Sequence, residues 1–281
     1  MTKEHLINFQ PEHRRTYHLA ESPRSRIVAL ITGTVVPLLF CLFLFACSTA
    51  PTTEDIKKAE SHNKRGASFL SNGDLNKAFV EFQEALKVNP ENRETLNYLG
   101  YISYRYGKNE EAVSYYKKAL AIDPNYSEAV NNLGVTYAAL EQWDKAIHQF
   151  NAALKDPTYR TPDLAYSNLG FVYYMKGEYR EAEMALREAL VRNPVSARTM
   201  YVLGLVYIKL GDDSLAIDSL MKAIGMVPDY IDAHWELANI HLRSGDKARA
   251  LKHFEVVAEK GEDAAMVRNA AEHIQNLKYA Y

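Results

Sequence analysis

Small residues recur along this chain with a period of about 34 residues, and this constrains the fold more than any other feature. The marks are Gly66, Gly100, Gly134, Gly170 and Gly204, with Ala238 in the sixth place, at spacings of 34, 34, 36, 34 and 34 residues. An alanine follows each mark after twelve residues, and a large apolar residue follows four residues later. A period of this length is the signature of a solenoid built from repeated supersecondary units.

Each mark has a physical role in a unit of two crossing helices. We expect the glycine of the first helix to face the alanine of the second, beside the large apolar side chain. Proline, which lacks an amide proton, ends the second helix at Pro90, Pro124, Pro194 and Pro228. A second glycine, at Gly73, Gly107, Gly177 and Gly211, opens the turn between the two helices.

The pattern resembles the tetratricopeptide repeat family. It predicts an all-α chain: a right-handed superhelical solenoid of six tetratricopeptide repeats with a C-terminal capping helix. The predicted repeats span residues 59–92, 93–126, 127–160, 163–196, 197–230 and 231–264. Because each repeat buries its apolar face only against its neighbours, the array needs closed ends. We expect a capping helix over residues 263–279, with Val267, Ala270, Ala271, Ile274 and Leu277 at helical spacing.

The N-terminal region predicts export. Residues 1–46 have an extended head and then an uncharged run after Arg26, which is typical of a signal peptide. The run ends in Leu44-Phe45-Ala46-Cys47, which resembles a bacterial lipobox, so Cys47 is the predicted lipidation (palmitate) site and Cys41 belongs to the discarded signal. The alternative is an uncut membrane anchor. Residues 47–58 then form a short linker into the first helix, with a helix start near Thr53.

Composition and motifs argue against several classes of function. Of the 33 basic and 35 acidic residues, five and three lie in the predicted signal, which leaves the mature chain at net −4. This charge does not favour nucleic acid as a partner. No phosphate loop, GxSxG, HExxH or calcium loop occurs, so we expect neither an enzyme nor a cofactor. His234 and His241 share one predicted helix but are too few for a metal site.

Function is therefore expected on the concave face, which the first helices of the repeats line in this fold. The predicted partner-binding groove is aromatic and aliphatic with a few amides and lacks the Lys/Asn/Arg clamp by which some members grip a peptide C-terminus. Its residues are Asn97, Tyr101, Tyr104, Asn131, Val135, Phe171, Tyr174, Tyr201, Leu205 and Trp235. Such a stripe favours a partner polypeptide with apolar anchors. The alternative is that neighbouring repeats curl enough to bury part of it.

The join between the third and fourth repeats carries two extra residues. Here Asp156, Tyr159 and Asn168-Leu169-Gly170, together with the tail EKGEDAAMVRNAAEHI, resemble the type IV pilus pilotins, which are outer-membrane lipoproteins with six tetratricopeptide repeats. The resemblance implies a periplasm-facing outer-membrane lipoprotein that helps secretin subunits to reach the membrane and multimerise. Two other partners stay open for the same fold: cell-wall hydrolases, and an exopolysaccharide or exosortase system.

Overall fold

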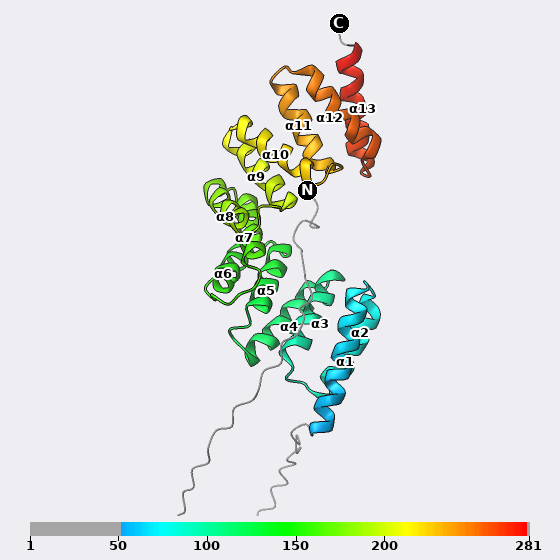
Figure 1. The fold of residues 1–281 in the computed structure, drawn as a ribbon, viewed down its shortest axis with the longest axis vertical. Coiled ribbons are helices and arrows are strands. Elements are labelled where there is room, and N and C mark those ends of the chain that lie inside the picture. Colours follow the sequence, from blue (N-terminus) through cyan, green and yellow to red (C-terminus); the bar gives the residue numbers. More distant parts are fainter. Residues whose placement is uncertain (1–51, 280–281) are drawn as a thin grey trace, which may run out of the picture.

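The computed structural model describes residues 52–279, and this part of the chain consists of helices and short connections (Figure 1). The helices are α1 (Thr53–Ser71), α2 (Leu75–Val88), α3 (Arg93–Arg105), α4 (Asn109–Ile122), α5 (Ser127–Ala139), α6 (Trp143–Ala153), α7 (Pro162–Lys176), α8 (Tyr179–Arg192), α9 (Ala197–Leu210), α10 (Asp213–Met226), α11 (Ile231–Arg243), α12 (Lys247–Lys260) and α13 (Ala264–Tyr279). Consecutive helices pair as six hairpins, and α13 packs on α12. The predicted all-α solenoid with a capping helix is confirmed.

Local chemistry sets where the helices begin. Thr52 caps α1 through a reciprocal capping box, in which the Asp55 amide donates to Thr52 Oγ1 and the Thr52 amide donates to Asp55 Oδ2. The start thus lies one residue from the predicted position. Asp74, Asn92 and Ser196 accept a backbone amide hydrogen bond in the same way at the starts of α2, α3 and α9.

The glycine on each first helix makes room for the large residue of its partner helix. A Cβ atom on Gly66 would lie 2.7 Å from the Phe82 ring, and one on Gly100 would lie 2.7 Å from the Tyr116 ring. In the fourth repeat, a Cβ on Gly170 would meet Leu186 at 2.5 Å. The predicted partners of these glycines were the alanines, whereas the nearest atoms belong to the large side chains. The ring or Leu lies directly against the glycine because the helices cross there.

The glycines predicted to open the turns between paired helices lie in those turns and adopt the left-handed conformation. Gly73, Gly107, Gly177 and Gly211 have φ between 73° and 82°, and Gly245 at 80° extends the series to the sixth repeat. The third repeat has Glu141 at this place, with φ 59°. It is the single non-glycine residue with positive φ among residues 52–279. This conformation disfavours a residue with a Cβ atom.

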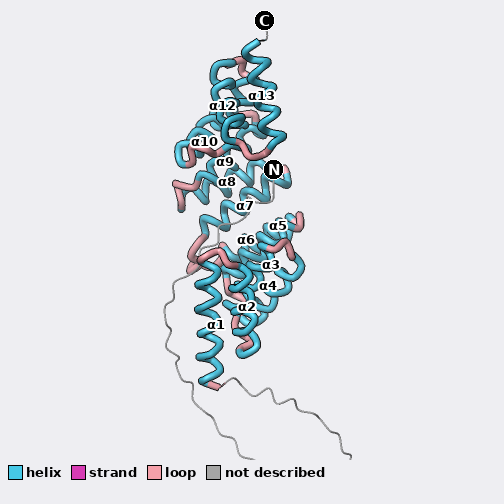
Figure 2. Tube along the Cα trace, turned by 90° about the vertical axis from the view of Figure 1, so that its right-hand side faces the viewer, coloured by secondary structure: helices cyan, strands magenta, loops and turns pink. Residues whose placement is uncertain are grey.

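The first helices of successive hairpins share one face of the solenoid. Helix α3 contacts α5, α5 contacts α7, and α7 contacts α9, in addition to the contacts within each hairpin. Figure 2 shows the stacked array from the side, with α1 at one end and α13 at the other. Within residues 52–279, none of the helices has both the length and the apolar character needed to cross a membrane.

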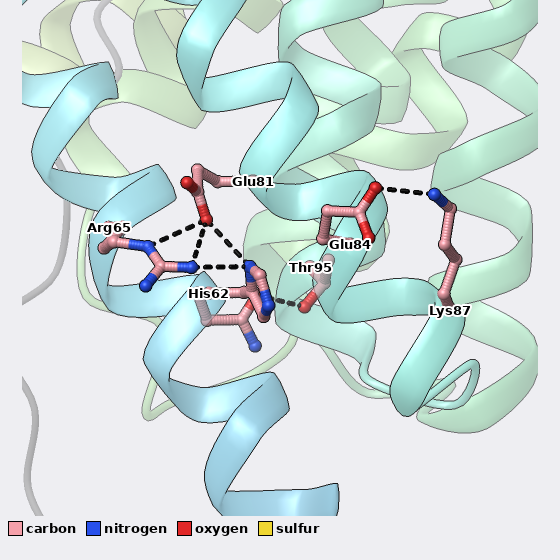
Figure 3. Close-up of polar contacts among 7 residues, drawn as sticks. His62, Arg65, Glu81, Glu84, Lys87 and Thr95 are labelled. Atoms are coloured by element: carbon pink, nitrogen blue, oxygen red, sulfur yellow. Dashed lines mark hydrogen bonds and ion pairs between the residues drawn. The ribbon is translucent and has the colours of Figure 1, made fainter.

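Polar contacts tie the first hairpin together (Figure 3). Glu81 of α2 accepts from Arg65 Nε at 3.0 Å, and its Oε2 lies 2.8 Å from His62 Nδ1. Burial acts to raise the pKa of Glu81, but the hydrogen bonds from Arg65 and His62 outweigh it and lower that pKa. On the next face of α1, Asn63 Oδ1 accepts from the Thr95 hydroxyl of α3 at 2.6 Å.

The join between the third and fourth hairpins has its own small core. Tyr159 is buried among Val130 of α5, Ala153 of α6 and Ala165 of α7. Asp156 accepts from the Thr158 amide and hydroxyl and from the Ser127 hydroxyl. The two extra residues therefore form a packed turn.

Helix α13 covers the last hairpin. Ala270 is fully buried against Val257 and Phe254 of α12, and the rings of Phe254 and His273 stack at 4.6 Å. Ile274 and Leu277 pack on the same cluster. At the other end of the chain, the predicted signal, Cys41 and the lipidation site Cys47 lie outside the described residues.

Candidate protein-binding groove

The ten residues predicted to line the groove all lie on first helices. Helix α3 carries Asn97, Tyr101 and Tyr104, and α5 carries Asn131 and Val135. Helix α7 carries Phe171 and Tyr174, α9 carries Tyr201 and Leu205, and α11 carries Trp235. Contacts between α3, α5, α7 and α9 bring four of these five helices side by side. We keep the name groove for this set of ten residues.

The groove residues differ in exposure. Asn97, Tyr101, Asn131, Val135, Phe171, Tyr201 and Leu205 are each at most 8% exposed. Tyr104, Tyr174 and Trp235 are partly buried. The accessible surface of the groove therefore lies mainly at these three aromatic side chains, one in each of the second, fourth and sixth repeats.

Aromatic contacts fix the groove side chains against the second helices and turns. The Tyr174 ring lies 6.0 Å from the ring of Tyr179, and the Trp235 ring packs edge-on against Phe254 at 5.6 Å. Tyr201 lies 4.9 Å from Tyr230 in the turn before α11. Rings held in this way present apolar surface with little remaining rotamer freedom, which favours their use as anchors for a partner.

Amides form a short ladder across α3 and α5. Asn132 donates to Asn97 Oδ1 at 3.0 Å, and Asn97 donates in turn to the hydroxyl of Tyr126 at 3.4 Å. Asn131 donates to Asn132 at 3.5 Å, while its own Oδ1 is buried without a hydrogen-bond partner. An unsatisfied buried acceptor is unusual in a folded protein.

Arg198 of α9 is a charged side chain that is not among the ten predicted groove residues. Its Nη1 donates to Ser167 Oγ at 3.4 Å and its Nη2 to Asn168 Oδ1 at 3.3 Å, both on α7. Its Nε is buried without an acceptor. Desolvation lowers the pKa of Arg198 to about 10. Arg198 lies on the same first helix as the groove residues Tyr201 and Leu205.

Acidic groups lie further along the concave face. Burial raises the pKa of Glu236 on α11, and the neighbouring charge of Asp232 raises it further. The charge of Glu236 in turn contributes to the raised pKa values of Tyr174 and Tyr201, which burial dominates. Carboxylates and phenols therefore share this end of the groove.

Three histidines cluster between α11 and α12. His234 and His241 of α11 both lie against His253 of α12, with ring centroids 5.1 Å and 5.8 Å apart. Since the carbonyl of Pro228 only accepts, His234 Nε2 donates to it, and neutral His234 then accepts at Nδ1 from His253 Nδ1. Among residues 52–279, no group of three His, Cys, Asp or Glu side chains has the arrangement needed to hold a metal ion.

Comparison with protein families decides the class of the chain. Two family profiles, both described as tetratricopeptide repeat, match it: one over residues 103–158, the other over residues 63–127, 168–231 and 216–265. The chain belongs to the tetratricopeptide repeat family. This tetratricopeptide repeat fold is typical of proteins that bind other proteins without catalysing a reaction.

Solved structures with this fold include two from type IV pilus systems. The structure of PilW, described as a widely conserved type IV pilus biogenesis factor, has a TM-score of 0.71 at 21% identity and covers 76% of this chain and 98% of PilW. PilF of Pseudomonas aeruginosa has a TM-score of 0.70 at 16% identity and covers 78% of this chain and 99% of PilF. At these identities the likeness shows the fold alone.

Curated relatives share the repeats over a part of their length. The BBSome complex member BBS4 of Bos taurus is 27% identical over 190 residues, which are 68% of this chain. The match spans 36% of BBS4, about a third of that relative. The common feature is therefore the tetratricopeptide array.

Proposed function

We propose that this protein is a membrane-tethered periplasmic scaffold whose groove binds a polypeptide partner, and that the partner is a secretin subunit of a type IV pilus system. The lipid on Cys47 would hold the array at the inner face of the outer membrane. In this role the protein assists secretin subunits in reaching the membrane and multimerising.

The observation that carries the proposal is the groove itself. Tyr104, Tyr174 and Trp235 retain exposed surface on the concave side, from the second, fourth and sixth repeats, and the rings of Tyr174 and Trp235 are braced by aromatic neighbours. Rigid aromatic anchors spaced along one concave face suit an extended or helical segment with apolar side chains. A secretin subunit in transit exposes such segments before its strands pair.

The choice of pilus partner has separate support. The fold matches PilW and PilF over nearly their whole length, at 98% and 99% of those chains. The join at Asp156–Tyr159 and the C-terminal segment are the parts of the sequence that resemble the pilotins, and both are packed parts of the array.

Deleting the gene in its source organism tests the proposal. We expect the heat-resistant secretin multimer of the outer membrane to disappear, and the wild-type gene to restore it. If multimers form normally and cell-wall cleavage or polysaccharide export is lost, the partner is instead a hydrolase or an export component.

The anchor is tested in the same strain. Cys47→Ala is expected to abolish incorporation of labelled palmitate and to leave secretin multimers reduced or mislocalised. Cys41→Ala is the matched control and should leave both unchanged. Palmitate labelling that persists in the Cys47 variant would contradict lipidation at this residue.

A further inference from the structure

Arg198 differs from several exposed arginines of residues 52–279 in what surrounds its guanidinium. Arg65, Arg187 and Arg243 each pair with a carboxylate, and their side chains are 51%, 60% and 51% exposed. Arg198 has its Nε sealed from solvent, and no carboxylate within residues 52–279 lies in ion-pair distance of it. Arg198 as a whole is partly buried, and its desolvation lowers its pKa. A partly desolvated cation without a counter-charge is costly for a folded protein, because the desolvation is not repaid by an ion pair.

The contacts that Arg198 does make are weak. Its two hydrogen bonds go to the neutral oxygens of Ser167 and Asn168 and are long, at 3.4 Å and 3.3 Å. Charge-assisted hydrogen bonds of arginine are typically shorter, at about 2.7–2.9 Å. The guanidinium therefore lacks a strong acceptor, while its planar fork is suited to a carboxylate.

Phenols from distant parts of the chain converge on Arg198. The charge of Arg198 acts on Tyr104 of α3 and on Tyr230 before α11, although burial dominates and raises the pKa of both, for Tyr230 to about 12. Both phenols are thus neutral at physiological pH and have a hydroxyl hydrogen to donate. Tyr104 and Tyr230 come from the second repeat and from the turn that opens the sixth, so the site exists only in the assembled solenoid.

We propose that Arg198 is an anion-binding residue of the groove and takes the carboxylate of an aspartate or glutamate side chain in the partner polypeptide. The inference rests on the proposed function, because it names a chemical feature of the same partner. It adds a cationic determinant to a concave face whose other side chains are aromatic, aliphatic and amide and, at α11, acidic.

The position of Arg198 favours an acidic side chain over a chain terminus. Arg198 lies on α9, and partly exposed anchors occur on both sides of it, at Tyr174 of α7 and Trp235 of α11. A segment that contacts both anchors passes Arg198 in mid-chain, where it presents side chains. One cation surrounded by neutral donors also matches the single negative charge of a carboxylate better than the double charge of a phosphate.

Thermal denaturation separates a binding role from a structural one. Arg198→Gln removes an unpaired, partly desolvated charge and retains a polar group beside Ser167 and Asn168, so we expect the unfolding temperature of the unliganded full chain to stay the same or rise. A clear fall in this temperature would mean that Arg198 is present to hold α7 and α9 together, which would overturn the proposal.

A random peptide library displayed on phage, panned against the full chain in mild detergent, supplies the ligand. We expect enriched peptides to share apolar residues and one Asp or Glu at a fixed place. The charge-matched control is Arg268→Gln, at an exposed residue, which should enrich the same peptides as the wild type. Peptides enriched on Arg198→Gln should keep the apolar residues but should no longer share an Asp or Glu. Failure to enrich any peptide would overturn the proposed groove function, and this inference with it.

One enriched peptide then completes a double-mutant cycle. Replacing its acid by the amide should weaken binding to the wild-type chain about tenfold and leave binding to Arg198→Gln unchanged. Arg198→Lys should recover part of the loss, since charge is kept and the planar fork is not. Two outcomes would show that Arg198 does not bind the acidic side chain: the acid-to-amide change weakens binding to Arg198→Gln as well, or only amidation of the peptide C-terminus weakens binding. In either case the proposed groove function would stand.

Discussion

At the scale of single residues, Glu141 shows how one repeat departs from its neighbours. It occupies the turn position held by glycine in the other five hairpins, with φ 59°. A residue with a Cβ atom loses about 1 kcal/mol or more in this conformation. We expect Glu141→Gly to raise the free energy of unfolding by about 0.5–1 kcal/mol in urea denaturation. Gly107→Ala, in the same turn of the second repeat, should lower it. Equal destabilisation by both changes would contradict the argument.

Adjacent tyrosines in α7 separate binding from packing. Tyr174 is the partly exposed groove anchor, so Tyr174→Ala should weaken partner binding at least about tenfold, since an anchor in a desolvated centre is worth ~2 kcal/mol. The Tyr174→Ala variant should still fold. Tyr173 is also partly buried against the main core cluster, and its place in the repeat predicts a packing role between the two helices. Tyr173→Ala should therefore lower the free energy of unfolding by about 2 kcal/mol. If Tyr174→Ala unfolds the chain and Tyr173→Ala spares it, the groove residues are shifted by one position.

At the scale of helices, the sequence predicts the elements better than the side-chain clusters between them. The period predicts α1 to α13 because each hairpin depends on itself and its neighbours, and the Thr52 cap lies one residue from its predicted place. The surroundings of Arg198 depend on the superhelical curl, which brings Tyr104 of the second repeat near the fifth. Repeat spacing specifies which residues face inward but not how tightly the superhelix winds.

The histidine cluster joining α11 and α12 predicts a pH-dependent stability. Desolvation lowers the pKa of His253, and the neighbouring imidazoles of His234 and His241 lower it further, to about 4, since a proton on either repels one on His253. As the pH falls, His253 binds a proton near pH 6.5 in the unfolded chain but only near pH 4 in the folded chain. Stability is therefore full above pH 6.5 and falls through this window, by about 2 kcal/mol between pH 7 and pH 5 for one such group.

His253→Gln tests this coupling. Glutamine keeps a donor for His234 Nδ1 but does not titrate, so the free energy of unfolding should fall less between pH 7 and pH 5 than in the wild type. Chemical denaturation at several pH values measures the slope. The control is His148→Gln on the exposed side of α6, which should keep the wild-type slope. An unchanged slope in His253→Gln would show that this histidine is not the group responsible.

At the scale of the whole molecule, a solenoid responds to damage locally. Ala146 of α6 is fully buried between the helices of the third repeat, so Ala146→Leu should overpack this crossing by about 1–3 kcal/mol. The strain reaches distant repeats only through successive interfaces. The calorimetric transition should therefore broaden or split rather than shift as one. Ala248→Leu, on the exposed side of α12, adds the same volume outside the core and should leave the transition unchanged. If the whole calorimetric transition of Ala146→Leu instead moved to lower temperature without broadening, the six hairpins and α13 would unfold as one cooperative unit. Strain at any repeat would then reach the groove.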